Sequence, residues 1–244
     1  MSAISKIVQA HRPGLEPYES LCMFFDVEVL RTLAYRISDQ HFHSNPELSF
    51  LEKATARTIH SQLAKLQAFE VFPEIGGYGL AAVFKNGSGK TVLLRADIDG
   101  LPVEEKTDLP YASKARMLDT DGIEKPVMHA CGHDIHITSL LAAAETLVRA
   151  KEEWKGTLLL VFQPAEEKGA GARAMVNDGL YKKVPVPDVA IGAHVVPYRT
   201  GMFQSQLFVS MKEVFQTFAT CFSQSLGTIG TRRGLMACAA DSFQ

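Results

Sequence analysis

The segment TVLLRADIDGLP, residues 91–102, contains the pattern that indicates the fold. Its first half, Thr91–Ala96, is apolar apart from Arg95, as expected of a strand that is covered on both faces of a sheet. Two acidic residues follow directly, Asp97 and Asp99. Alone, such a pair is most simply a solvated turn. Two carboxylates at a strand end could also bind a metal ion or orient a metal-bound histidine.

Strands and helices alternate on both sides of this segment. Further strands are predicted at 80–85, 158–162 and 189–195, and helices near 49–67, 134–148 and 170–178. Ser49 and Glu52 match the S-x-x-E capping box of the first helix, and Asn86–Gly87 is predicted as a turn before Thr91. This alternation predicts an α/β fold with a largely parallel sheet. The ligand site of such a sheet lies at the carboxyl ends of its strands.

The composition is that of a globular chain with balanced charge. Of the 244 residues 46% are hydrophobic, and 25 Lys+Arg against 27 Asp+Glu give a net charge of −2. These values argue against intrinsic disorder and against nucleic-acid binding. The four cysteines are too irregularly spaced for a disulfide framework, and neither a secretory signal nor a membrane span is recognisable. We therefore expect a cytoplasmic protein with no membrane or nucleic-acid partner.

The segment HACGHDIH, residues 129–136, is dense in side chains that bind metal ions. It contains three histidines, one cysteine and one aspartate, just before a predicted helix. Thiolate and imidazole both suit Zn²⁺ and similar ions. One alternative is a small buried cysteine with capping side chains. Another makes Cys131 a nucleophile with a histidine base.

Two further clusters follow predicted strands. Glu166 and Glu167 come shortly after strand 158–162, and His194 ends strand 189–195. Adjacent carboxylates can divide the work, since one binds a metal ion while its neighbour takes a proton from water. The alternatives are an acidic helix start and a histidine satisfied within the core. Because every cluster follows a strand, we expect them to converge at one edge of the sheet.

Five blocks of the sequence occur in a characteristic order. They are HFHSNPELSFLEKAT (41–55), LLRADIDGLPVEE (93–105), MHACGHDIHITSLLAAAETL (128–147), GTLLLVFQPAEEKGAGARAMVNDGL (156–180) and IGAHVVP (191–197). Together they resemble the metal-dependent amidohydrolases and metallopeptidases of the aminoacylase and zinc carboxypeptidase family. The nearest branch contains hippurate hydrolase and the auxin–amino-acid conjugate hydrolases. The resemblance implies a three-layer α/β/α metallo-exopeptidase catalytic domain with a mixed, largely parallel sheet.

The resemblance also implies a role for each candidate residue. Two divalent ions, Zn²⁺, Mn²⁺ or Co²⁺, would be bound, with Cys131 bridging them. The implied metal ligands are Cys131, His133, Glu167 and His194. Glu166 would be the general base, and Asp99 would orient a ligand. The implied reaction is hydrolysis of the amide bond in N-acyl amino acids or small peptides by metal-activated water.

Two stretches match nothing in this family. The first is 22–40, which lies within an N-terminal lead-in of residues 1–40. The second is 202–227. It separates the catalytic part, residues 41–201, from residues 228–244, where the family pattern resumes on the path to the lid domain. Both stretches are interpreted as foreign inserts, such as retained introns. The alternative for 202–227 is an amphipathic helix, because its apolar residues fall near helical spacing.

The family pattern implies further parts beyond these blocks. Intact members continue into a lid or dimerisation domain, form homodimers and contribute a final metal-binding histidine, none of which follows before Gln244. We therefore expect a truncated catalytic domain with weak or no turnover. The alternatives are a non-catalytic fragment that binds metal or an amino acid, and a thiol hydrolase based on Cys131.

Overall fold

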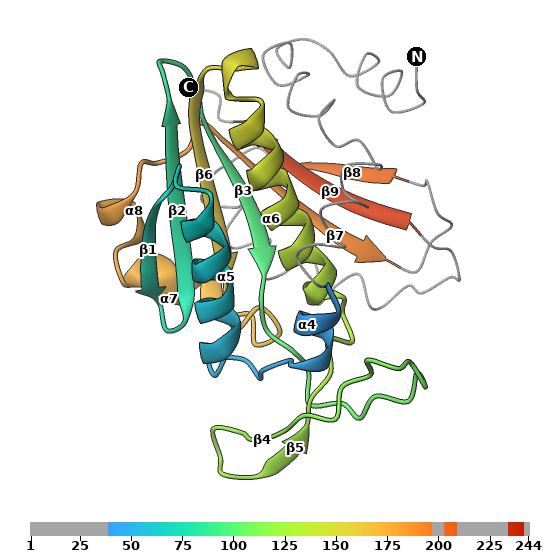
Figure 1. Ribbon diagram of the computed structural model, residues 1–244. Coiled ribbons are helices and arrows are strands. Elements are labelled where there is room, and N and C mark those ends of the chain that lie inside the picture. The colour runs from blue at the N-terminus through green and yellow to red at the C-terminus, as the bar shows by residue number, and fades with distance from the viewer. Residues whose placement is uncertain (1–38, 197–202, 209–233, 242–244) are drawn as a thin grey trace.

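The computed structural model describes residues 39–196, 203–208 and 234–241 (Figure 1). The helices are α4 (Asp39–Ser44), α5 (Lys53–Lys65), α6 (His133–Arg149), the 3₁₀ helix η2 (Lys151–Glu153), α7 (Gly171–Asn177) and α8 (Leu180–Lys183). The strands are β1 (Glu70–Ile75), β2 (Gly79–Asn86), β3 (Thr91–Asp97), β4 (Arg116–Leu118), β5 (Glu124–Pro126), β6 (Gly156–Gln163), β7 (Val189–Val196), β8 (Phe203–Phe208) and β9 (Gly234–Asp241).

The main sheet is mixed, as predicted. Its strand order is β1-β2-β6-β3-β7-β9-β8, and its centre, β6-β3-β7, is parallel. The pairs β1–β2, β2–β6 and β7–β9 are antiparallel. The consecutive strands β2 and β3 do not pair with each other, because β6 lies between them. The predicted turn at Asn86–Gly87 therefore leads across the sheet and does not close a hairpin.

Helices cover both faces of this sheet, which gives the predicted three-layer α/β/α architecture (Figure 1). The central strand β6 supplies both cores, because its side chains alternate between the two faces. Leu158, Leu160 and Phe162 pack with α5 and α6 in one core. Leu159 and Val161 pack in the other core, to which α7 and α8 contribute. All five side chains are buried, as a strand covered on both faces requires.

The predicted capping box is wrong. Helix α5 begins at Lys53, and Glu52 makes no side-chain capping bond. The carboxylate of Glu47 accepts the N–H groups of Ala54 and Thr55 at the start of the helix. The side chains of Ser49 and Glu52 are buried. Ser49 donates to Asp99, and Glu52 accepts the N–H groups of Phe50 and of the distant Ala165, which sequence spacing alone does not show.

Two further elements differ from the sequence-based expectations. The edge strand β1 was not predicted, because its half-exposed sequence EVFPEI contains Pro73, which is tolerated at a sheet edge. Residues 203–208 form strand β8, so the alternative of an amphipathic helix is wrong for these residues. The remainder of the two unmatched stretches, residues 22–38, 202 and 209–227, lies outside the described residues. Within the described part, no helix is long and apolar enough to cross a membrane.

Candidate metal centre

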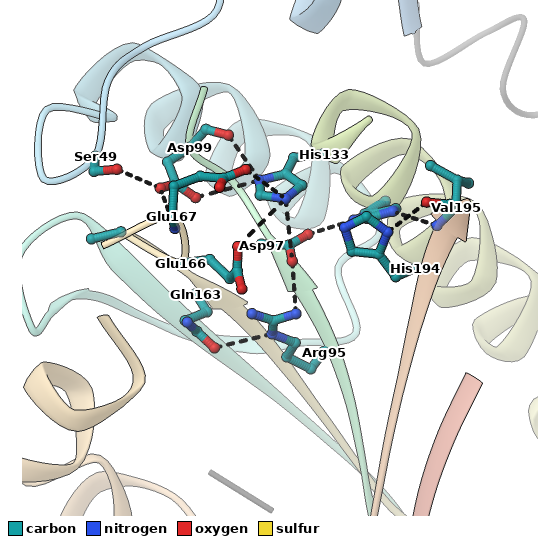
Figure 2. A network of polar contacts seen from close by, with 12 residues as sticks. Ser49, Arg95, Asp97, Asp99, His133, Gln163, Glu166, Glu167, His194 and Val195 are labelled. Carbon is teal, nitrogen blue, oxygen red and sulfur yellow. Dashed lines mark hydrogen bonds and ion pairs between the residues drawn. The ribbon is translucent and has the colours of Figure 1, made fainter. Parts of the chain in front are cut away.

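Polar side chains meet where the parallel strands at the centre of the sheet end (Figure 2). Asp97 ends β3, and it lies opposite Gln163, the last residue of β6. His194 lies near the end of β7. His133 is the first residue of α6 and follows Gly132, whose φ of 79° suits glycine. The predicted convergence of the clusters at one sheet edge is thus observed.

The imidazole of His133 lies at the centre of this site. Its Nδ1 is 2.8 Å from the backbone carbonyl oxygen of Asp99, so Nδ1–H donates to that oxygen. Its buried Nε2 makes no hydrogen bond among the described residues. Carboxylate oxygens of Asp97 and Glu167 lie 3.6 Å from Nε2, and one of Glu166 lies at 3.8 Å. A nitrogen that faces three carboxylates without a hydrogen bond is the arrangement that a bound cation would satisfy.

The charge around His133 has a clear effect on its pKa. Burial acts to lower it, but Asp97, Asp99 and Glu166 outweigh burial and raise the pKa of His133 to about 10. Without a cation, the imidazole is therefore positively charged at neutral pH, with a proton on Nε2 as well as on Nδ1. A metal ion that binds Nε2 must displace this proton, which couples metal affinity to pH.

Two overlapping groups of side chains could hold metal ions. One consists of Cys131, His133 and Glu167, and the other of Asp97, His133, His136 and His194. In each group the donor atoms lie within 4.8 Å of one another. The structure thus brings all four predicted ligands into two sites that share His133. Thiolate, imidazole and carboxylate donors together suit Zn²⁺, Mn²⁺ and Co²⁺, so the donor set fits the predicted ions.

Asp97 and His136 belong to clusters found in the sequence, but neither was among the four implied metal ligands. The backbone N–H of Val195 donates to His136 Nε2 at 2.9 Å, so the proton of this ring lies on Nδ1. Nδ1–H donates to Asp97 Oδ1 at 2.5 Å, and Arg95 Nη1 donates to Asp97 Oδ2 at 2.7 Å. Both nitrogens of His136 are thus engaged within the chain. The three-residue spacing of His133 and His136, which places them on one helix face, was the available sequence signal.

Asp97 is a charged group inside this network. Its burial opposes ionisation, but Arg95, His133 and His136 outweigh burial and hold the pKa of Asp97 well below its usual range. The pair Asp97–His136 connects β3, α6 and the backbone beside His194. We interpret it as a brace between these elements, with the adjacent guanidinium of Arg95 disfavouring a further cation on Asp97.

The two adjacent glutamates differ in their surroundings. Glu166 is only 4% exposed, and burial raises its pKa to about 7, with Asp97 and Glu167 adding to the effect. Glu167 is half-buried, and burial likewise raises its pKa. Its N–H donates to Asp99 Oδ2 at 3.1 Å. A carboxyl group that titrates near neutrality can accept and return a proton, which suits Glu166 to general base catalysis.

Cys131 is half-buried and faces acidic groups. Burial raises the pKa of its thiol, and the carboxylates of Glu167, Glu166 and Asp97 raise it further. A thiol in these surroundings ionises when a cation is bound beside it. The geometry therefore favours Cys131 as a metal ligand over the alternative of a free nucleophile. His129, from the same segment, belongs to neither group; it is buried, and burial lowers its pKa to about 4.

Comparison with known proteins places this site in a family. Residues 93–204 match peptidase family M20/M25/M40. These residues belong to an M20 peptidase domain. The matched range contains both carboxylate clusters, the HACGHDIH segment and His194. The predicted family, and with it the class of amidohydrolases and peptidases, is confirmed.

Relatives of this M20 domain are longer than the chain. Hippurate hydrolase of Campylobacter jejuni is 46% identical over 157 residues, which are 64% of this chain and 38% of that protein. An IAA-amino acid hydrolase of Arabidopsis thaliana is 38% identical over 164 residues, covering 67% of this chain and 33% of that protein. A solved Bacillus subtilis structure, a dinuclear metal binding peptidase from the M20 family, has 36% identity and a TM-score of 0.58. That match covers 68% of this chain and 44% of that one.

Proposed function

We propose that the chain is the catalytic part of a metal-dependent hydrolase that cleaves the amide bond of N-acyl amino acids or small peptides. The observation that carries the proposal is the place of Glu166, a buried carboxyl group 3.8 Å from the Nε2 atom of His133. The names of the relatives, hippurate hydrolase and IAA-amino acid hydrolase, support an N-acyl amino acid as substrate. The cytoplasm as the compartment and a homodimer as the assembly of the intact protein remain sequence-based predictions.

Each residue has a distinct part in this proposal. Cys131, His133, Glu167 and His194 would hold the divalent ions. Bound ions supply a Lewis acid that lowers the pKa of water and polarises a carbonyl group. The carboxylate of Glu166 takes a proton from the attacking water and then returns it to the nitrogen of the leaving amine. Asp99 holds the imidazole of His133 through its carbonyl oxygen, so Nε2 faces the site.

Metal content and hydrolysis together test the proposal. The purified chain is loaded with Zn²⁺, Mn²⁺ or Co²⁺, its metal content is measured, and N-benzoylglycine and other N-acyl amino acids are assayed. We expect bound metal and weak or no turnover, which chelation abolishes. Failure to bind any of the three ions would contradict the proposal. Hydrolysis that persists after removal of the metal and is stopped by a thiol alkylator would instead show that the chain is a thiol hydrolase.

A non-catalytic fragment that binds metal or an amino acid is the second candidate. The observation behind it is that the chain spans only 33–44% of the length of its relatives. The two candidates differ in one measurement. The fragment binds metal but shows no chelator-sensitive hydrolysis at any metal concentration, whereas even slow metal-dependent turnover favours the enzyme.

A further inference from the structure

One buried carboxylate joins two distant turns of the backbone. Glu52 has no exposed surface. Its Oε1 atom accepts the N–H of Phe50 and the N–H of Ala165, each at 2.8 Å. Ala165 lies 113 positions further along the chain, at the start of the loop that carries Glu166. Glu52 therefore connects the segment before α5 to the loop after β6.

Each of the two turns contains a residue with an unfavourable backbone conformation. Phe50 has φ of 67° and Ala165 has φ of 46°, in the left-handed region that residues with a side chain seldom adopt. Such residues persist where their surroundings determine the conformation. The carbonyl of Ala165 accepts the N–H of Gly171 at 3.1 Å, while its own N–H is held by Glu52. The peptide groups on both sides of this turn are thus fixed.

The neighbouring Ser49 acts on the other side of Glu166. Its Oγ–H donates to Asp99 Oδ2 at 2.6 Å, inside the protein. The same oxygen accepts the N–H of Glu167 at 3.1 Å. Ser49 and Glu52 together reach the two backbone N–H groups that flank Glu166, one directly and the other through Asp99.

We propose that Ser49 and Glu52 are positioning residues that fix the backbone on both sides of Glu166 and so aim the adjacent carboxyl groups at the metal centre. This inference rests on the proposed function for the role of Glu166. A role in helix capping does not explain the two side chains, because Glu47 already accepts the N–H groups at the start of α5.

The full chain tests the inference with matched variants. Glu52→Ala removes the acceptor, whereas Glu52→Gln keeps an amide oxygen that can accept both N–H groups. Ser49→Ala removes the bond to Asp99. Glu47→Ala is the control, since it also removes a carboxylate that accepts two backbone N–H groups, but at the start of α5.

The first measurement is amide hydrogen exchange, which needs no metal. We expect Glu52→Ala to speed exchange at Ala165 by about tenfold or more, because a buried N–H has lost its acceptor. Ser49→Ala should speed exchange at Glu167, and Glu47→Ala only at the start of α5. Glu52→Gln should leave Ala165 within about threefold of the wild type, since the amide oxygen still accepts.

The second measurement is the affinity for Co²⁺, followed by its absorption bands. Loss of a side chain that orients metal ligands costs about 10–100-fold in affinity, so we expect losses of this order in Glu52→Ala and Ser49→Ala. Glu52→Gln and Glu47→Ala should bind as the wild type does.

The outcomes separate this inference from the proposed function. Unchanged exchange at Ala165 in Glu52→Ala, or equal effects of Glu47→Ala and Glu52→Ala on Co²⁺ affinity, would overturn the inference. If Glu52→Ala does not fold, unchanged exchange at Glu167 in Ser49→Ala overturns it instead. A wild-type chain that binds no Co²⁺ defeats the proposed function, while the exchange rates still decide whether the two residues hold the backbone.

Discussion

At the scale of single residues, two buried glutamates contribute to one turn but have different tasks. Glu166 lies beside the imidazole of His133, whereas Glu52 bonds to the backbone N–H groups of Phe50 and Ala165. Burial raises the pKa of both glutamates to about 7. The same physical cause thus suits Glu166 to the proposed proton transfer and makes the charge of Glu52 sensitive to pH.

Replacing Glu166 by Gln separates metal binding from proton transfer. The substitution keeps the size and the buried position of the side chain but removes its basic oxygen. We expect Co²⁺ affinity within about threefold of the wild type, while any hydrolysis falls about 100-fold or more, the usual contribution of a general base. Isothermal titration and an assay with N-benzoylglycine measure the two effects. Loss of Co²⁺ binding would make Glu166 a metal ligand, contrary to the assignment.

Replacing Glu52 by Gln should change how stability depends on pH. The pKa of Glu52 is about 7 in the folded chain, against an ordinary value of 4.5. Between these values the folded chain holds a proton that the unfolded chain has released, so stability falls as pH rises through this range. At about 1.4 kcal/mol per pKa unit, the loss is about 3 kcal/mol, and the Glu52→Gln variant would not show it. Urea unfolding of both chains at pH 5 and pH 8 measures this difference, and parallel losses would contradict it.

At the scale of secondary structure, periodicity predicted the buried strands and the helices that cover them. It did so because each element must bury an apolar face. The order of strands in the sheet was not predictable, since β6 pairs with partners that lie 60 or more positions away. For the same reason the sequence pattern wrongly predicted Ser49 and Glu52 as a helix capping box. A local pattern cannot show that a side chain bonds to Asp99 or to Ala165.

The start of α7 is a second element-scale constraint on the loop that carries Glu166. A Cβ atom on Gly171 would lie 1.5 Å from the carbonyl oxygen of Pro164, so Gly171→Ala must push the helix and the loop apart. We expect a loss of about 1–3 kcal/mol or more in the free energy of unfolding, together with weaker Co²⁺ binding. The control Arg173→Ala alters an exposed residue of the same helix and should change stability by less than about 0.5 kcal/mol. A stable Gly171→Ala chain with normal Co²⁺ affinity would contradict the close packing.

At the scale of the whole molecule, the candidate ligands come from several parts of the fold. Cys131 precedes α6, Glu167 follows β6 and His194 lies on β7. Cys131 and Glu167 belong to one donor group and His194 to the other, and both groups include His133, so ions held there would connect these segments only in the folded state. Metal binding should therefore stabilise the whole domain.

Thermal unfolding with and without metal measures this stabilisation. At a free Co²⁺ concentration about 100 times its Kd, the folded state gains about 2.7 kcal/mol, which raises Tm by about 5–10 °C in a domain of this size. Glu166→Gln should show the same rise, whereas Cys131→Ala and His133→Ala should lose most of it. An equal rise in all four chains would indicate unspecific binding.

The place of β6 between β2 and β3 also has a consequence for synthesis on the ribosome. Both earlier strands find their shared neighbour only when residues 156–163 have been made. The ribosome needs about 3–12 s to add the roughly 60 residues between Asp97 and Gly156 at about 5–20 residues per second. During that interval two apolar strands have open edges in a nascent chain. We expect chaperones to bind the nascent chain during this time, and the yield of folded protein to depend on them.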